Sequence, residues 1–187
     1  MATAASPGSG ISTTTRHLGR SLMWGAGGGV IASLVMAMFV MIAGATYLSS
    51  GFFTPLYHIA STFIAPDAMM QSMQAAMAGQ LFTFLPGPAL AGAIIHMMVG
   101  AMYGALFGLI AAWTRLHGAT LVAAATAWGL VVFAVSTWIA LPAAAALFGG
   151  GDPIQNMAAM VGYPTFILEH LMFGAALGLV LLKPTAR

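Results

Sequence analysis

Four long apolar runs, separated by polar or proline-rich segments, dominate the hydrophobic pattern of this chain. They lie at about residues 24–48, 89–113, 119–141 and 164–182. An α-helix needs about 20 apolar residues to cross the hydrocarbon layer of a bilayer, and each run is close to that length or longer. The pattern therefore predicts an all-α fold, an integral membrane four-helix bundle in which each run forms one span.

The first connection, residues 51–88, contains four prolines, and proline interrupts helices because it has no backbone N–H and clashes with the preceding turn. This segment is expected to form two short helices, near 55–64 and 67–79, that lie in the outer interface. Residues 143–163 form a second outer connection, with a short helix expected after Asp152. Pro142 is expected to end the third span.

The composition supports membrane insertion. The chain of 187 residues is 60% hydrophobic and only 4% charged, with a mean hydropathy of +0.97, whereas soluble domains carry about 25% charged residues. The lipid bilayer is therefore the expected partner. No basic patch is present that would bind the phosphates of a nucleic acid. The absence of cysteine excludes disulfides, thiolate metal sites and cysteine nucleophiles.

The charged residues predict the orientation. With four spans and a cytoplasmic N-terminus, all five basic residues fall on one side of the membrane: Arg16, Arg20, Arg115, Lys183 and Arg187. Asp67 and Asp152 then fall on the other side. Because cytoplasmic loops are enriched in Lys and Arg, this arrangement predicts a multi-pass protein of the inner membrane with both termini in the cytoplasm.

Residues 1–20 are small and polar, and they are expected to form a disordered cytoplasmic tail before a single transmembrane domain at 21–187. A cleaved signal peptide is the alternative, with Ala43-Gly44-Ala45 as the cleavage site. The first apolar run is longer than the usual apolar region of a signal peptide, which favours a permanent span.

Two helices carry the same pattern of a histidine followed by glycines at every fourth position. His96 precedes Gly100 and Gly104 in the second span, and His170 precedes Gly174 and Gly178 in the fourth. Such spacing places the residues on one face of a helix, and small residues allow helices to approach closely in lipid. The repetition predicts two duplicated helical hairpins in parallel orientation, although chance similarity between Ala- and Gly-rich segments is the alternative.

The spans, the segments FTPLYHIAS (53–61) and TWIALP (137–142), and the paired His-x3-Gly-x3-Gly helices resemble uncharacterised small four-span membrane proteins of bacteria. The resemblance covers most of residues 21–182. It implies the four-span fold, but it implies no activity and no functional residue.

The candidate chemistry lies in four residues. Glu169 is the one acid within a span, and a charge inside a bilayer is expensive unless it faces protein. His96 and His170 are candidate ligands for haem b or a transition metal such as iron, copper, zinc or nickel. His58 could fold toward His96 and Glu169, which makes Glu169 a further candidate metal ligand beside the three histidines. His58 could also form a copper(I) site with Met69, Met70, Met73 and Met77. For each residue the alternative is a structural hydrogen bond or an interfacial position.

No catalytic residue is expected. The glycine triplets lack the lysine and the strand–loop–helix context of a phosphate-binding loop, and no pair of acids suits hydrolysis. The sequence favours a small membrane protein that acts by binding or association, as an accessory subunit or a homodimer, with no reaction of its own. The alternatives are a haem or metal protein using His96, His170 and His58, and a proton or ion pathway around Glu169.

Overall fold

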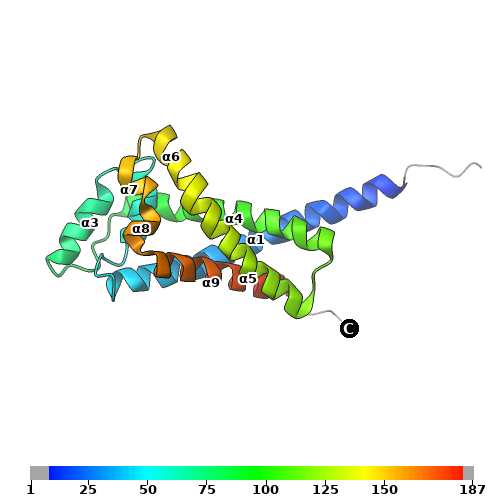
Figure 1. Cartoon of the computed structure of the whole chain (residues 1–187). Coiled ribbons are helices and arrows are strands. Elements are labelled where there is room, and N and C mark those ends of the chain that lie inside the picture. The colour runs from blue at the N-terminus through cyan, green and yellow to red at the C-terminus, as the bar shows by residue number, and fades with distance from the viewer. Residues whose placement is uncertain (1–8, 183–187) are drawn as a thin grey trace, which may run out of the picture.

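The computed structural model describes residues 9–182, and within that range helices joined by turns and loops are the only regular secondary structure, with no strand. Figure 1 shows a long bundle with short helices gathered at one end. Four helices are long and apolar enough to cross a membrane, at His17–Ala45, Pro86–Thr114, Gly118–Phe148 and Tyr163–Leu181. These helices confirm the predicted all-α class and the number of long apolar helices.

The long helices pack in the order α4, α1, α9, α5. Helix α1 (Ser9–Ala45) packs against both α4 (Pro86–Thr114) and α9 (Tyr163–Leu181), and α9 packs in turn against α5 (Gly118–Val135). Helices α4 and α5 are consecutive in the chain but make few contacts with each other. The bundle is therefore tightly packed on three sides and loosely packed on the fourth.

Glycine makes the close contact between α1 and α4 possible. A methyl group added to Gly29 would collide with the carbonyl oxygen of Gly100, and one added to Gly104 would collide with the backbone of Gly25 and Gly29. The carbonyl oxygen of Ser21 blocks a methyl group at Gly108 in the same way. Small residues thus let the two backbones touch along several turns.

The α5–α9 pair is built in the same way. A methyl group on Gly174 would meet the carbonyl oxygen of Ala125, and one on Gly178 would lie 2.8 Å from the Cα of Val122. On the α5 side, Gly129 leaves room for the carbonyl oxygen of His170. The glycines that follow each histidine therefore lie against a neighbouring helix.

The first helix begins earlier than the sequence predicts. Helix α1 starts at Ser9, so residues 9–20 continue the helix and are not the disordered tail expected there. These residues contain serine and threonine but no proline, and they precede an uninterrupted apolar helix that can extend backwards by adding backbone hydrogen bonds. Residues 1–8 of the predicted tail, and Lys183 and Arg187 near the other terminus, lie outside the described residues.

Pro142 does not end the third long helix, so that prediction is wrong. Helix α5 continues through a π-helical turn, η1 (Ser136–Ala140), into α6 (Leu141–Phe148). The π turn widens the backbone just before the proline, and Pro142 lies within the first two positions of α6. A proline inside a continuous helix removes one backbone hydrogen bond and crowds the preceding turn, and the π-helical turn directly before Pro142 accommodates its ring without ending the helix.

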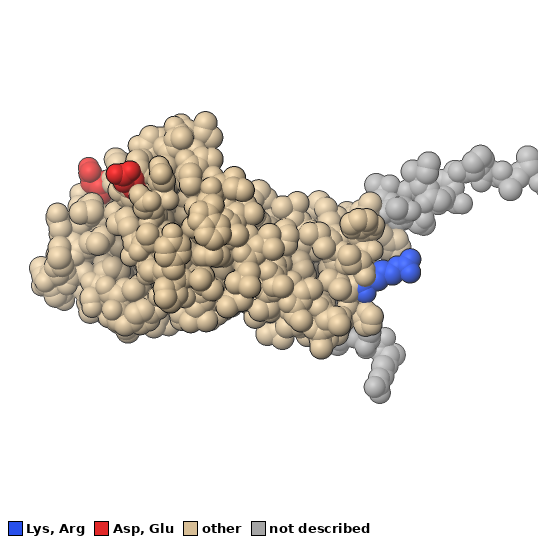
Figure 2. Space-filling view, viewed as in Figure 1, with Lys and Arg blue, Asp and Glu red and all other residues tan. Residues whose placement is uncertain are grey.

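Short helices cover one end of the bundle. They are α2 (Thr54–Ser61) and α3 (Ala68–Met77) from the first connection, and α7 (Gly151–Gln155) and α8 (Met157–Val161) from the second. The fully buried Tyr57 joins α2 to the start of α4, because its hydroxyl donates to the carbonyl oxygen of Thr83 (2.9 Å) and accepts from the N–H of Leu85 (2.7 Å). Figure 2 shows acidic side chains at this end of the molecule and basic side chains at the other.

Candidate functional site

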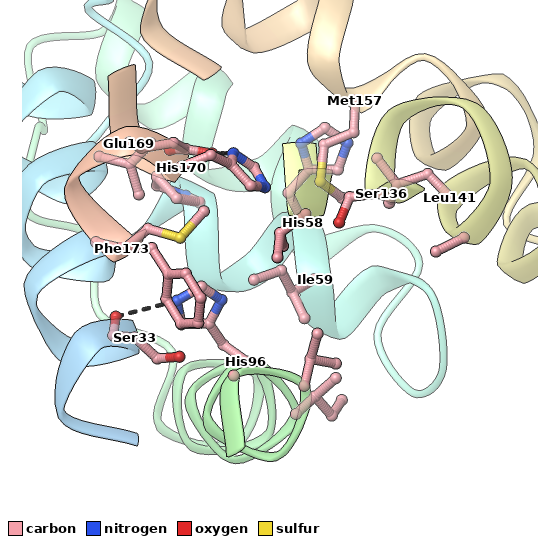
Figure 3. Close-up of a pocket in the computed structure, with 18 of the residues that line it drawn as sticks. Ser33, His58, Ile59, His96, Ser136, Leu141, Met157, Glu169, His170 and Phe173 are labelled. Carbon is pink, nitrogen blue, oxygen red and sulfur yellow. Dashed lines mark hydrogen bonds and ion pairs between the residues drawn. The ribbon is translucent and has the colours of Figure 1, made fainter. Parts of the chain in front are cut away.

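A cavity of about 280 Å³ lies where the long helices meet the covering helices. Its wall includes residues of α1, α2, α4, α5, η1, α6, α8 and α9, and most of these are apolar. The polar exceptions include all four residues singled out from the sequence: His58, His96, Glu169 and His170. Figure 3 shows these side chains converging from three different helices.

Glu169 and His170 enter the cavity from α9, and both are almost completely buried, with 3% of each residue exposed. Oε1 of Glu169 lies 3.7 Å from Nδ1 of His170. Oε2 of Glu169 is buried and has no hydrogen-bond partner among the described residues. A buried polar atom without a partner costs about 1–3 kcal/mol, so this oxygen is the point in the cavity where a ligand would gain most.

The ring of His170 is held by its own helix and by aromatic neighbours. Nδ1 donates a hydrogen bond to the carbonyl oxygen of Phe166 at 2.7 Å. The rings of Phe166 and Phe133 lie 4.6 Å and 5.8 Å from the imidazole, centre to centre. Since Nδ1 carries the proton in the neutral ring, Nε2 keeps its lone pair.

His96 connects α4 to α1. Its Nε2 donates to the carbonyl oxygen of Ser33 at 3.1 Å, as the dashed line in Figure 3 marks. In the neutral ring this bond leaves the lone pair on Nδ1. His96 therefore has a structural role between two helices and still offers an acceptor atom to its surroundings.

His58 joins the two outer connections. Its Nε2 donates to the carbonyl oxygen of Pro153 in α7 at 2.8 Å, and only 5% of the residue is exposed. Burial lowers the pKa of His58, and the bond to Pro153 opposes this shift only in part. The ring is therefore held neutral near pH 7, with its Nδ1 lone pair free to accept.

The four residues share the cavity but do not form a compact metal site. No group of three or more His, Asp or Glu side chains within residues 17–182 is close enough to hold one ion. The methionines around the cavity are Met36, Met102 and Met157. The methionines of α3, which the sequence suggested as copper ligands beside His58, are not part of the cavity wall.

The cavity reaches the outer surface of the bundle between α4 and the third long helix. Val99 and Met102 line the cavity from α4, yet Val99 is 43% exposed and Met102 is 52% exposed on the outside of the bundle. The two helices meet nearer the Arg115 end, where Nε1 of Trp128 donates to the carbonyl oxygen of Tyr103 at 3.2 Å. The opening thus faces sideways from the flank of an apolar bundle.

Other polar residues at the site carry weak signals in the sequence. Ser33 and Ser136 line the cavity, Ser136 from the π-helical turn. Hydroxyl residues are common in membrane helices, and only the folded structure shows which of them face one another. An unusual turn inside a long helix often marks a functional site, but its position depends on the packing around Pro142.

Comparisons of the chain with protein-family models, curated proteins and solved structures find no match.

Proposed function

We propose that the protein spans a membrane four times, with the ends of the chain on the cytoplasmic side. The four apolar helices support insertion, and the separation of basic and acidic side chains seen in Figure 2 supports the orientation. An inner membrane of a bacterium is the expected location. The outer connections would then cover the cavity on the side away from the cytoplasm.

Within the membrane the protein would act by binding a small molecule, with no reaction of its own. The observation that carries this proposal is the unpaired Oε2 of Glu169, buried in the wall of a largely apolar cavity. Ligand sites are typically apolar pockets with a few polar groups that orient the ligand. An accessory subunit or a homodimer that presents such a ligand to a larger membrane complex fits the small size of the chain.

A cavity-filling substitution tests this function. Val132 lines the cavity and is 5% exposed, whereas the neighbouring Val131 is 45% exposed on the outside of the same helix. Octan-1-ol should raise the melting temperature of the detergent-purified protein and of the Val131→Phe variant, but not that of Val132→Phe. Equal responses of both variants would show that the alcohol binds elsewhere, and the proposal would be wrong.

A haem or metal protein is the second candidate. Each of the three imidazoles donates one N–H to a backbone carbonyl, an arrangement that orients histidines bound to metals. An absorbance spectrum and elemental analysis of the purified protein would test it. A Soret band or a stoichiometric metal that is lost in both His96→Ala and His170→Ala supports this candidate, and a colourless metal-free protein rejects it. The mostly apolar wall gives less support to a proton or ion pathway.

We also propose that the bundle arose from two duplicated hairpins. One constant shift along the chain relates His96, Gly100 and Gly104 to His170, Gly174 and Gly178. A second constant shift relates the residues they approach on α1, Gly29 and Ser33, to Ala125 and Gly129 on α5. Superposing α1 and α4 on α5 and α9 in an experimental structure should overlay the two histidines, and a mismatch of a full turn would argue for coincidence.

A further inference from the structure

We propose that the ligand of this cavity is a lipophilic amine, whose ammonium group pairs with Glu169 and whose apolar part fills the rest of the space. This inference rests on the proposed binding function and specifies the chemical class of the ligand. It follows from three features of the described residues: the hydrogen-bonding character of the wall, its charge and its opening.

The three histidines and Glu169 in the wall offer acceptors to a ligand. His58, His96 and His170 each use their N–H for a backbone carbonyl, so each neutral ring has only a lone pair left. Oε2 of Glu169 adds an unpaired carboxyl oxygen. An ammonium group has up to three N–H donors and no acceptor, so its hydrogen-bonding needs complement those of the wall.

The charge of the cavity wall also favours an amine as the ligand. Glu169 is the one Asp, Glu, Lys or Arg among the residues that line the cavity. An anionic ligand would have no cation to pair with here, and a charge buried without a partner is costly. If the carboxyl group is protonated before binding, a neutral amine can take that proton from it. The products are an ammonium and a carboxylate whose charges cancel.

The opening on the side of the bundle favours a ligand that dissolves in lipid. Val99 and Met102 border the cavity and are exposed on the flank of the apolar bundle, away from the charged ends. A molecule that enters between α4 and the third long helix would come from the hydrocarbon layer. Amines with an apolar body reach that layer in their neutral form, whereas strongly hydrated amines do not.

A matched set of probes tests the inference: octylamine, octan-1-ol, octanoate and octyltrimethylammonium, each added to the detergent-purified protein. Binding would be measured as a dissociation constant by calorimetry and as a rise in melting temperature. Octylamine should bind about tenfold or more tightly than octan-1-ol, because only the amine can form a charge-assisted hydrogen bond with the carboxylate of Glu169. Octyltrimethylammonium, which has the charge but no N–H donor, should bind no better than the alcohol.

The variant Glu169→Gln should abolish the advantage of octylamine and leave the binding of octan-1-ol in place. The matched control is Asp152→Asn, because Asp152 is exposed and lies outside the cavity wall. If Glu169→Gln fails to fold, the comparison of octylamine with its trimethylated form in the unaltered protein still decides. Equal affinity for amine and alcohol overturns this inference alone, whereas no Val132-dependent binding of any probe overturns the proposed function as well.

Discussion

His96 and His170 line the same cavity, yet they hold the backbone through opposite nitrogens of the ring. His96 donates from Nε2 to the carbonyl oxygen of Ser33 on another helix, and His170 donates from Nδ1 to the carbonyl oxygen of Phe166 on its own helix. The two histidines occupy matching positions in the sequence pattern. Their hydrogen bonds nevertheless differ. His96 stabilises the α1–α4 pair, while the ring of His170 makes no hydrogen bond to another helix within the described part of the chain.

Adding a methyl group at a glycine contact should separate packed helices. Gly29→Ala, whose Cβ would collide with the carbonyl oxygen of Gly100, should destabilise the protein by about 1–3 kcal/mol. Gly27→Ala is the control, since nothing lies within 4 Å of its Cβ position. Alanine favours helices, so this control should be neutral or stabilising. Thermal unfolding in detergent would compare the two, and equal melting temperatures would contradict the close packing.

Removing the hydroxyl of Tyr57 should loosen the join between α2 and α4. In Tyr57→Phe, the carbonyl oxygen of Thr83 and the N–H of Leu85 lose their partner, which should cost about 1–3 kcal/mol of stability. Tyr163→Phe changes the same group at a residue that is 46% exposed and should have little effect. The melting temperatures of both variants would test this, and a loss in Tyr163→Phe as large as in Tyr57→Phe would argue against a special role.

Stability should fall as the pH drops below about 6.5, in part because of His58. Burial lowers its pKa from the ordinary value of 6.5, so the unfolded chain binds the proton more readily than the folded protein. Its contribution to stability is therefore present above pH 6.5 and decreases as the pH falls toward the lowered pKa. The variant His58→Gln should show a weaker dependence of melting temperature on pH between 7 and 5. An unchanged profile would mean that His58 does not titrate on unfolding.

Labelling with an impermeant thiol reagent should reveal the orientation. The chain has no cysteine, so each introduced thiol can be followed without background. In intact cells Asp152→Cys should react, because Asp152 lies at the end assigned to the outside. His117→Cys, in the exposed turn between α4 and α5, should react only after the membrane is opened. The reverse pattern would invert the proposed topology.

The long helices could be predicted from the sequence because their signal is local. The run expected at 164–182 is α9 (Tyr163–Leu181), and the run at 89–113 lies within α4 (Pro86–Thr114). Twenty consecutive apolar residues leave few other structures open to a chain in lipid. The two ends that were predicted wrongly, at Ser9 and Pro142, depend on backbone hydrogen bonds that composition does not reveal.

The cavity could be predicted from the sequence only in part. The cost of burying polar groups suggests that Glu169, His170, His96 and His58 gather together, and the structure brings all four to one wall. Their partners, in contrast, are mostly backbone carbonyls, such as that of Pro153. Any residue can supply a carbonyl oxygen, so no residue type in the sequence marks those partners. The opening at Met102 likewise depends on how far α4 and α5 diverge.

The central place of α1 has a consequence for biosynthesis. Once α4 has been synthesised, α1 can pair with it through Gly29. The neighbouring Gly28 instead faces α9, where Cδ1 of Leu177 lies 3.1 Å from the position of a Cβ atom added to Gly28. Helix α9 is the last described helix to be synthesised, and it carries Glu169. If the protein inserts into a membrane as proposed, the carboxyl group therefore enters it after the segments that carry His58 and His96 have been made. In that order of synthesis, the buried side chain of Glu169 can meet the other walls of its cavity as soon as α9 packs against the bundle.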